Sequence, residues 1–240
     1  MKKFALLILT VVFIAVNGYS QGEIPLIGSK APSFTAMSTQ GKINFPDDYG
    51  KSWKILFSHP QDFTPVCSSE LLELANMENE FDKLGTRIAV ISTDNLEQHN
   101  LWIKYLEGID YKNRGPQKIY FPIIEDSKGK VAKEYGMIHD KVSSNRDVRG
   151  VFIIDPDNVI RSVNFYPMEV GRNMNEIERI LVALQKTEKE HVLTPANWKE
   201  GDDVMVPYYP YTKKQLAENP KLADDYYTMG NRVWFKKAQK

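Results

Sequence analysis

The sequence contains very little cysteine: Cys67 is the only one among 240 residues. A single thiol excludes an internal disulfide, a CxxC redox motif and a cysteine-rich zinc site. The chain also has no excess of charge of either sign, because 31 lysines and arginines balance 31 aspartates and glutamates. Without a basic footprint, binding to nucleic acid has no electrostatic basis. Any chemistry at sulfur must be that of one thiol, and we expect the partners to be small molecules or proteins.

Signatures of bound cofactors are missing as well. The four histidines are scattered and lack the two-histidine helical spacing of a metal site, and the sequence has no glycine-rich phosphate loop. We therefore expect no metal, nucleotide or flavin cofactor.

The hydrophobic run at the start is too short for a membrane-spanning helix. It covers residues 4–16, thirteen residues, against the roughly 20 that a helix needs to cross a bilayer. Lys2 and Lys3 precede it, and the small residues Gly18 and Ser20 follow, which is the pattern of a secretory signal peptide. We expect residues 1–20 to be removed and the mature protein to be exported to the periplasm or the extracellular space, without stable membrane insertion.

Residues 21–190 alternate short apolar segments with longer amphipathic ones, which is typical of an α/β domain with a central sheet. Trp53–Ser58 and Arg87–Thr93 predict two buried, neighbouring strands. Apolar residues at three- and four-residue spacing between them predict a crossover helix that ends at Gly85. The other expected elements are helices at Leu96–Leu106, Lys130–Tyr135 and from Met174 to about Glu190, and a hairpin of strands Val148–Asp155 and Val159–Tyr166.

Residues 191–240 differ in composition and pattern: they contain four prolines and eight aromatic residues, and their hydrophobic periodicity is weak. Such a segment does not suggest an independent compact core, yet its aromatic residues are typical of packing surfaces and interfaces. We interpret it as a C-terminal arm or small domain. Two hypotheses stay open: the segment embraces a second subunit in a homodimer, or it folds back on its own domain.

The position of Cys67, in the segment FSHPQDFTPVC between the first predicted strand and the crossover helix, places it in the first turn of that helix. Unpaired backbone N–H groups and the helix dipole favour a thiolate there. The competing interpretation is that a lone cysteine is a small buried hydrophobic residue.

Pro60, Thr64 and Cys67 form the pattern PxxxTxxC, which resembles the active-site signature of the peroxiredoxins, and specifically the one-cysteine, peroxiredoxin-6-like branch. The resemblance implies a thioredoxin-like α/β fold with a mixed central sheet flanked by helices. It also implies thiol-dependent reduction of hydrogen peroxide and organic hydroperoxides. Further segments match this family in order: FPII at 121–124, Arg149 before VFIIDP at 151–156, YP at 166–167 with GRN at 171–173, and TP at 194–195 with WKEGD at 198–202.

The resemblance also implies roles for individual residues. Cys67 is the expected nucleophile, Arg149 the cation that stabilises the thiolate and the leaving oxygen, and Thr64 the hydroxyl that positions peroxide. Pro60 is expected to shield the sulfur from water.

Three further residues have expected supporting roles, each with an alternative interpretation. Glu70, one helical turn after Cys67, is expected to orient Arg149, although a solvated glutamate also suits a helix N-terminus. Arg172 matches a second arginine of the family, or is a plain surface residue. His59 adjoins the motif, where a structural donor is the simpler interpretation.

The lack of a second cysteine has a chemical consequence. A sulfenic acid formed at Cys67 has no partner thiol in the chain, so an external thiol reductant must restore it.

Three other functions can be compared with thiol-dependent peroxide reduction. A non-catalytic thioredoxin-fold binding protein has no need of Thr64, Cys67 and Arg149 together. A thiol hydrolase needs a base within reach of Cys67, for which His59 is the candidate. A phospholipase site, proposed for mammalian members of the family, would use Ser52 and Asp157 but meets Pro46 where it needs a histidine.

Overall fold

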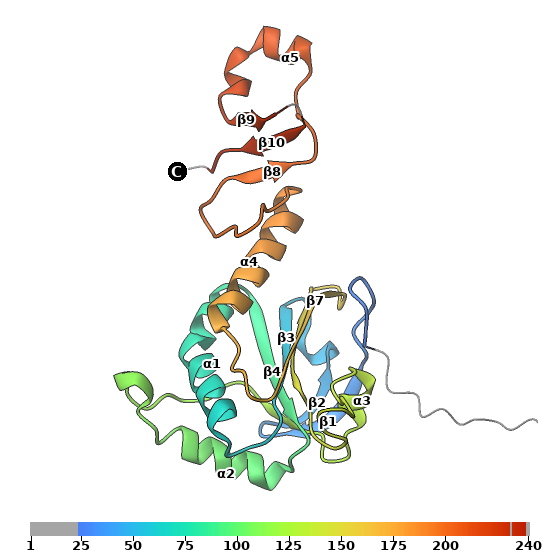
Figure 1. Ribbon diagram of the computed structural model, residues 1–240, viewed down its shortest axis with the longest axis vertical. Coiled ribbons are helices and arrows are strands. Elements are labelled where there is room, and N and C mark those ends of the chain that lie inside the picture. Colours follow the sequence, from blue (N-terminus) through green and yellow to red (C-terminus); the bar gives the residue numbers. More distant parts are fainter. Residues whose placement is uncertain (1–23, 231, 239–240) are drawn as a thin grey trace, which may run out of the picture.

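The computed structural model describes residues 24–230 and 232–238, so the predicted signal peptide lies outside the described residues. Seven strands form one mixed sheet in the order β2-β1-β5-β4-β3-β6-β7 (Figure 1). β3 pairs with β4 and β4 with β5 in parallel, while the other neighbours are antiparallel. The strands are β1 (Phe34–Ser38), β2 (Gly41–Phe45), β3 (Trp53–Ser58), β4 (Thr86–Ser92), β5 (Ile123–Glu125), β6 (Arg149–Ile154) and β7 (Ile160–Tyr166).

The centre of the sheet agrees with the sequence prediction. β3 has the expected bounds and all of its residues are buried, while β4 begins and ends one residue earlier than expected. The crossover helix α1 (Pro65–Lys83) joins them, and the chain turns out of it at Gly85, where φ is 63°. β6 and β7 form the expected antiparallel hairpin. The central mixed sheet flanked by helices is therefore confirmed.

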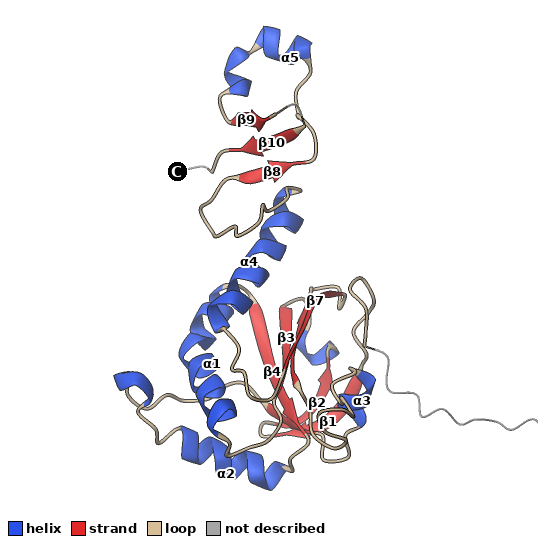
Figure 2. Cartoon of the chain, viewed as in Figure 1, coloured by secondary structure: helices blue, strands red, loops and turns tan. Residues whose placement is uncertain are grey.

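Alternating side chains of the central strands face two different cores. Ile55 and Phe57 belong to the core shared with α1, α2 and α4, whereas Leu56 belongs to the core beneath α3 and the β1–β2 hairpin. This alternation is what a strand buried on both faces requires. Figure 2 shows the helices on either side of the sheet. Helices α2 (Leu96–Leu106) and α4 (Met174–Glu190) have the predicted bounds, and α3 (Lys130–Glu134) ends one residue earlier than predicted.

The C-terminal segment forms a small unit at the far end of α4 (Figure 1). It contains a three-stranded antiparallel sheet in the order β8-β10-β9, which the weak periodicity of this proline-rich segment did not predict. Its elements are β8 (Val204–Val206), α5 (Lys213–Glu218), β9 (Tyr226–Met229) and β10 (Val233–Lys236), and the 3₁₀ turns of the chain are η1 (Asp47–Tyr49), η2 (Tyr111–Asn113) and η3 (Pro220–Ala223).

A buried tryptophan fastens this unit to the helix that carries it. Trp198 packs with Val192 and Val204 against Val182 and Ala183 of α4. Burial of one indole and two valines gives the segment a small apolar cluster that it shares with α4, the last helix of the preceding domain. In this structure the segment therefore docks on its own chain.

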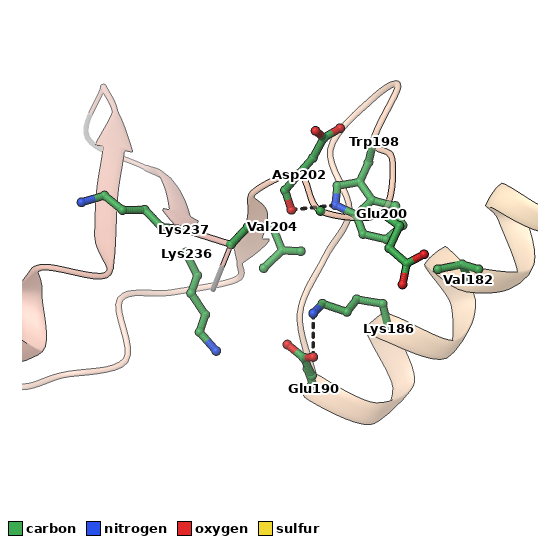
Figure 3. A pocket seen from close by; sticks show the side chains of 11 residues that line it. Val182, Lys186, Glu190, Trp198, Glu200, Asp202, Val204, Lys236 and Lys237 are labelled. Carbon is green, nitrogen blue, oxygen red and sulfur yellow. Dashed lines mark hydrogen bonds and ion pairs between the residues drawn. The ribbon is translucent and has the colours of Figure 1, made fainter. Parts of the chain in front are cut away.

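The same junction is hollowed by a cleft of about 540 Å³. Figure 3 shows its wall, where the Trp198 indole nitrogen donates to the Asp202 carbonyl and Lys186 pairs with Glu190 on α4. No helix within residues 24–230 and 232–238 combines the length and apolar character needed to cross a membrane.

Candidate active site

Cys67 lies where the chain leaves the sheet and enters α1. β3 ends at Ser58, a short loop follows, and Thr64 is the N-cap residue of the helix. Pro65 occupies the first helical position, where its missing N–H costs nothing. Cys67 is therefore the third residue of the helix and, at 0% exposure, sits inside the core cluster that α1 shares with the sheet. The predicted position of Cys67 in the first turn of the crossover helix is confirmed.

A buried arginine points at the sulfur. Arg149 begins β6, and its Nη1 lies 3.3 Å from the Cys67 Sγ. Its Nε and Nη2 both donate to the Met168 carbonyl, at 2.9 Å and 2.5 Å. With both sides of the guanidinium held, the group is fixed in the orientation that directs its remaining N–H groups toward the helix start.

Glu70 faces Arg149 from one helical turn beyond Cys67, and it is buried rather than solvated. Its Oε2 accepts from Arg149 Nη1 at 2.6 Å and from Arg172 Nη2 at 2.7 Å, and its Oε1 accepts from Arg172 Nε at 2.9 Å. Burial raises the pKa of Glu70, but the hydrogen bonds and charges of the two arginines outweigh it and hold that pKa below its ordinary value. The expected contact between Glu70 and Arg149 is present.

Arg172 is a fully buried brace rather than a surface arginine. Its Nη1 donates to the carbonyls of Ser58 and Gly150, both at 2.8 Å, and the guanidinium lies 3.3 Å from the centre of the Phe57 ring. It therefore joins the end of β3, the start of β6 and, through Glu70, the first turns of α1.

The charges of these buried groups do not balance. Two arginines and one glutamate carry a net charge of +1 in a region excluded from water. Burying an unbalanced charge is unfavourable. A negative charge that develops at this site therefore meets buried cations, of which Arg149 Nη1 lies 3.3 Å from the Cys67 Sγ.

Pro60 and Thr64 lie on the loop between β3 and α1. Pro60 is buried and Thr64 is half-buried, and the Thr64 hydroxyl donates to the Gln61 carbonyl at 2.9 Å. Within the described residues, neither makes a hydrogen bond to the Cys67 sulfur. The structure thus places the predicted hydroxyl at the N-terminus of the cysteine's own helix, without a direct contact.

His59 does not serve Cys67 as a base in this structure. Its Nε2 is 2.8 Å from Asp62 Oδ1, and the other oxygen of that carboxylate is 2.7 Å from Nδ1 of His99. Burial lowers the pKa of His59, against the opposing effect of Asp62. The hydrolase hypothesis therefore lacks its base contact among the described residues, while the structural-donor interpretation fits.

Sequence reasoning missed Asp62, His99 and the Met168 carbonyl as parts of this region. Asp62 and His99 stand 37 positions apart, and Met168 contributes through its backbone. A motif search registers side-chain types, so a backbone carbonyl that accepts a hydrogen bond carries no signal in the sequence.

The residues considered for a phospholipase site lie elsewhere. Ser52 immediately precedes β3, at the opposite end of that strand from Cys67. Asp157 is exposed and pairs with the exposed Lys51 at 2.6 Å. Pro46 follows β2 and has no basic group to offer.

Comparison with known families agrees with this geometry. The family model described as "AhpC/TSA family" matches residues 27–163, and the model for the C-terminal domain of 1-Cys peroxiredoxin matches residues 183–218. A peroxiredoxin of Methanosarcina mazei is 53% identical over 185 residues, covering 77% of this chain and 84% of that protein. The mitochondrial peroxiredoxin PRX1 of Saccharomyces cerevisiae is 45% identical over 203 residues, covering 81% and 76%.

Solved structures show the same relationship. The yeast mitochondrial 1-Cys peroxiredoxin aligns with a TM-score of 0.76 at 38% identity, covering 90% of this chain and all of that one. A cysteine-to-serine mutant of peroxiredoxin 6 from Arenicola marina aligns with a TM-score of 0.78 at 32% identity, covering 90% and 99%. With one cysteine held against a buried arginine and matches across both parts, the chain belongs to the peroxiredoxins of the AhpC/TSA family and is a thiol-dependent peroxidase of the 1-Cys type.

Proposed function

We propose that peroxide reduction proceeds by attack of the Cys67 thiolate on one peroxide oxygen. The S–O bond forms as the O–O bond breaks, sulfur becomes a sulfenic acid, and the leaving oxygen takes up a proton to give water or an alcohol. The observation that carries this assignment is the 3.3 Å contact between Arg149 Nη1 and the buried Cys67 Sγ. A fixed cation at that place stabilises both the thiolate and the negative charge that develops on the leaving oxygen.

The other residues of the site have supporting roles in this proposal. Thr64 offers its hydroxyl to align the O–O bond, and Pro60 limits access of water to the sulfur. Glu70 and Arg172 hold Arg149 in place through the ion pairs described above.

Mass spectrometry of protein treated with one equivalent of hydrogen peroxide and a sulfenic-acid trapping reagent tests the reaction. We expect one adduct, on Cys67, and no peroxide consumption by a Cys67→Ser variant that keeps the parent's circular dichroism spectrum. Unchanged turnover by that variant would refute the mechanism.

The sulfenic acid is reduced by a thiol from outside the chain, because the sequence holds no second cysteine. One external thiol forms a mixed disulfide with Cys67 and releases water, and a second thiol then releases Cys67 as its thiol. The yeast mitochondrial 1-Cys peroxiredoxin is resolved through the glutathione and thioredoxin systems. We expect turnover with dithiothreitol or glutathione. Without a thiol, we expect a fast phase that ends after one equivalent of peroxide, followed only by slower oxidation of the sulfenic acid to sulfinic acid.

We also propose that the protein is a homodimer in which the C-terminal unit contributes to the interface. Aromatic residues remain at its surface, including Tyr208 at 73% exposure, and such residues are typical of interfaces. Sedimentation should show a dimer for the parent and weaker association after truncation at Glu190. A monomeric parent would contradict the proposal.

Export is proposed from the leader sequence alone. The basic pair at residues 2–3 and the apolar run at 4–16 support it. Expression of the full gene with fractionation should yield a mature form outside the cytoplasm whose N-terminus begins near residue 21, and a full-length cytoplasmic product would contradict it.

A further inference from the structure

The loop that carries Pro60 and Thr64 is held by a buried carboxylate that takes no part in the chemistry at sulfur. Asp62 is almost fully buried, and its two oxygens bind two different imidazoles. His59 Nε2 lies 2.8 Å from Oδ1 and His99 Nδ1 lies 2.7 Å from Oδ2. His59 belongs to the loop itself, whereas His99 belongs to α2. The carboxylate therefore links the loop to α2, although Asp62 and His99 are 37 positions apart in the sequence.

The backbone amide of the same residue is bonded to the segment that leads into α2. The Asp62 amide donates to Asp94 Oδ2 at 2.7 Å, and Asp94 Oδ1 accepts from Arg146 Nη1 at 2.5 Å. Asp94 lies between β4 and α2, just before the helix that carries His99, so the side chain and the backbone of Asp62 are both bonded to this part of the chain. Fixing both removes the freedom of this residue to rotate.

The residue that follows is held in an uncommon conformation. Phe63 is not glycine, yet its φ is 56°, in the left-handed region. Residues of this kind keep such a conformation only where the surrounding contacts fix it. Phe63 directly precedes Thr64, so the position of the Thr64 hydroxyl depends on a backbone that the bonds of Asp62 help to hold.

The protonation pattern of the cluster follows from its hydrogen bonds. A carboxylate accepts only, so each imidazole must present an N–H to Asp62. Burial raises the pKa of Asp62, but the two imidazole hydrogen bonds outweigh it and hold that pKa below its ordinary value. The second nitrogen of each ring, His59 Nδ1 and His99 Nε2, is buried without a hydrogen-bond partner among the described residues. Among the described residues, Asp62 is thus the hydrogen-bond partner that orients both rings, and the His59 ring also packs 4.9 Å from that of Trp102.

We propose that Asp62 and His99 form a clamp that positions the peroxide-binding loop, and that they are positioning residues for the attack on peroxide. The proposal rests on the role given above to Thr64. Neither residue makes a hydrogen bond to the Cys67 sulfur among the described residues, so the clamp acts through the loop. Arg149 contacts the sulfur and the clamp residues do not, so we expect loss of the clamp to slow peroxide attack without moving the pH–rate profile.

Two substitutions at His99 test the clamp, because they differ only in whether a donor remains. In His99→Asn the side-chain amide places a donor close to the former Nδ1, while His99→Leu has none. We expect His99→Leu to lower the second-order rate constant for hydrogen peroxide by about 10- to 100-fold, the size of effect that a misplacement of about 1 Å produces. The midpoint of its pH–rate profile should match that of the parent, and His99→Asn should recover most of the rate.

A double-mutant cycle with Thr64→Val separates positioning from a general loss of stability. If the clamp acts through Thr64, His99→Leu slows the Thr64→Val protein by less than threefold. An equal loss in His99→Leu and His99→Asn, or an undiminished effect of His99→Leu in the Thr64→Val background, would overturn the clamp. A parent that forms no sulfenic acid at Cys67 would instead refute the proposed reaction, whereas an active parent matched by His99→Leu refutes the clamp alone.

Discussion

Replacing Asp147 with asparagine should stabilise the protein, and the gain should grow with pH. Asp147 is fully buried two positions before Arg149, and neither carboxylate oxygen has a hydrogen-bond partner among the described residues. Burial raises the pKa of Asp147 well above its ordinary value, and the nearby charges of Asp126 and Asp94 add to that effect while Arg146 opposes it. The folded protein therefore retains a proton that the unfolded chain releases.

The sign and the slope follow from proton linkage. Between the unfolded pKa of Asp147 and its raised folded pKa, unfolding releases one proton, so the free energy of unfolding falls as pH rises. One proton corresponds to about 1.4 kcal/mol for each pH unit. Asp147→Asn does not titrate, so its advantage over the parent should increase by about that amount for each unit. For a domain of this size, this is a rise in relative Tm of about 3–6 °C per pH unit.

Urea unfolding of the parent and of Asp147→Asn from about pH 4.5 to 6.5 measures this difference, since other titrating groups cancel between the two proteins. Asp140→Asn is the matched control, because Asp140 is exposed on the same connecting segment. Parallel stability curves for the parent and Asp147→Asn would refute the reasoning, since they would show that the carboxyl titrates alike in both states.

Three further substitutions test the site and the C-terminal unit. Arg149→Gln removes the cation beside sulfur, so the peroxide rate should fall and the pH–rate profile should move to higher pH; a profile like the parent's excludes that role. Glu70→Ala leaves two arginines without their shared anion and should cost about 3–5 kcal/mol in urea unfolding, against less than about 1 kcal/mol for Glu80→Ala at an exposed pair. Because the pKa of Glu70 is held low, its contribution is present above its unfolded pKa and is lost as pH falls through the folded one, so parent and Glu70→Ala should converge in acid. Trp198→Ala should cost about 3–5 kcal/mol of docking and let limited proteolysis release the C-terminal unit; equal protease resistance would argue against docking through Trp198.

The sequence predicted the elements whose pattern is long or fully apolar. β3, α1, α2 and α4 have strong periodicity or continuous burial, and their observed bounds lie close to those expected. β1 and β2 are five-residue strands that mix buried with exposed positions, a pattern too short to separate from a loop. β9 and β10 carry no fully buried side chain, which explains the weak periodicity of that segment.

The site also contains residues that the sequence could identify and residues that only the structure brings together. Cys67, Thr64 and Pro60 are close in sequence, so a motif identifies them together. The burial of Glu70 depends on Arg149 and Arg172, which lie 79 and 102 positions away, and only folding brings them to it. The sequence pattern at Glu70 is the same for a solvated and a buried carboxylate, so the choice between them had to come from the structure.

The complete burial of the only cysteine makes it a built-in reporter of local opening. A bulky aromatic disulfide reagent reaches the sulfur only when the first turn of α1 moves away from the sheet, because Cys67 lies inside the core that the two elements share. Under conditions where closing is faster than labelling, the labelling rate measures the free energy of that opening. The labelling rate of this one sulfur atom therefore reports local unfolding at the start of α1 without any engineered probe.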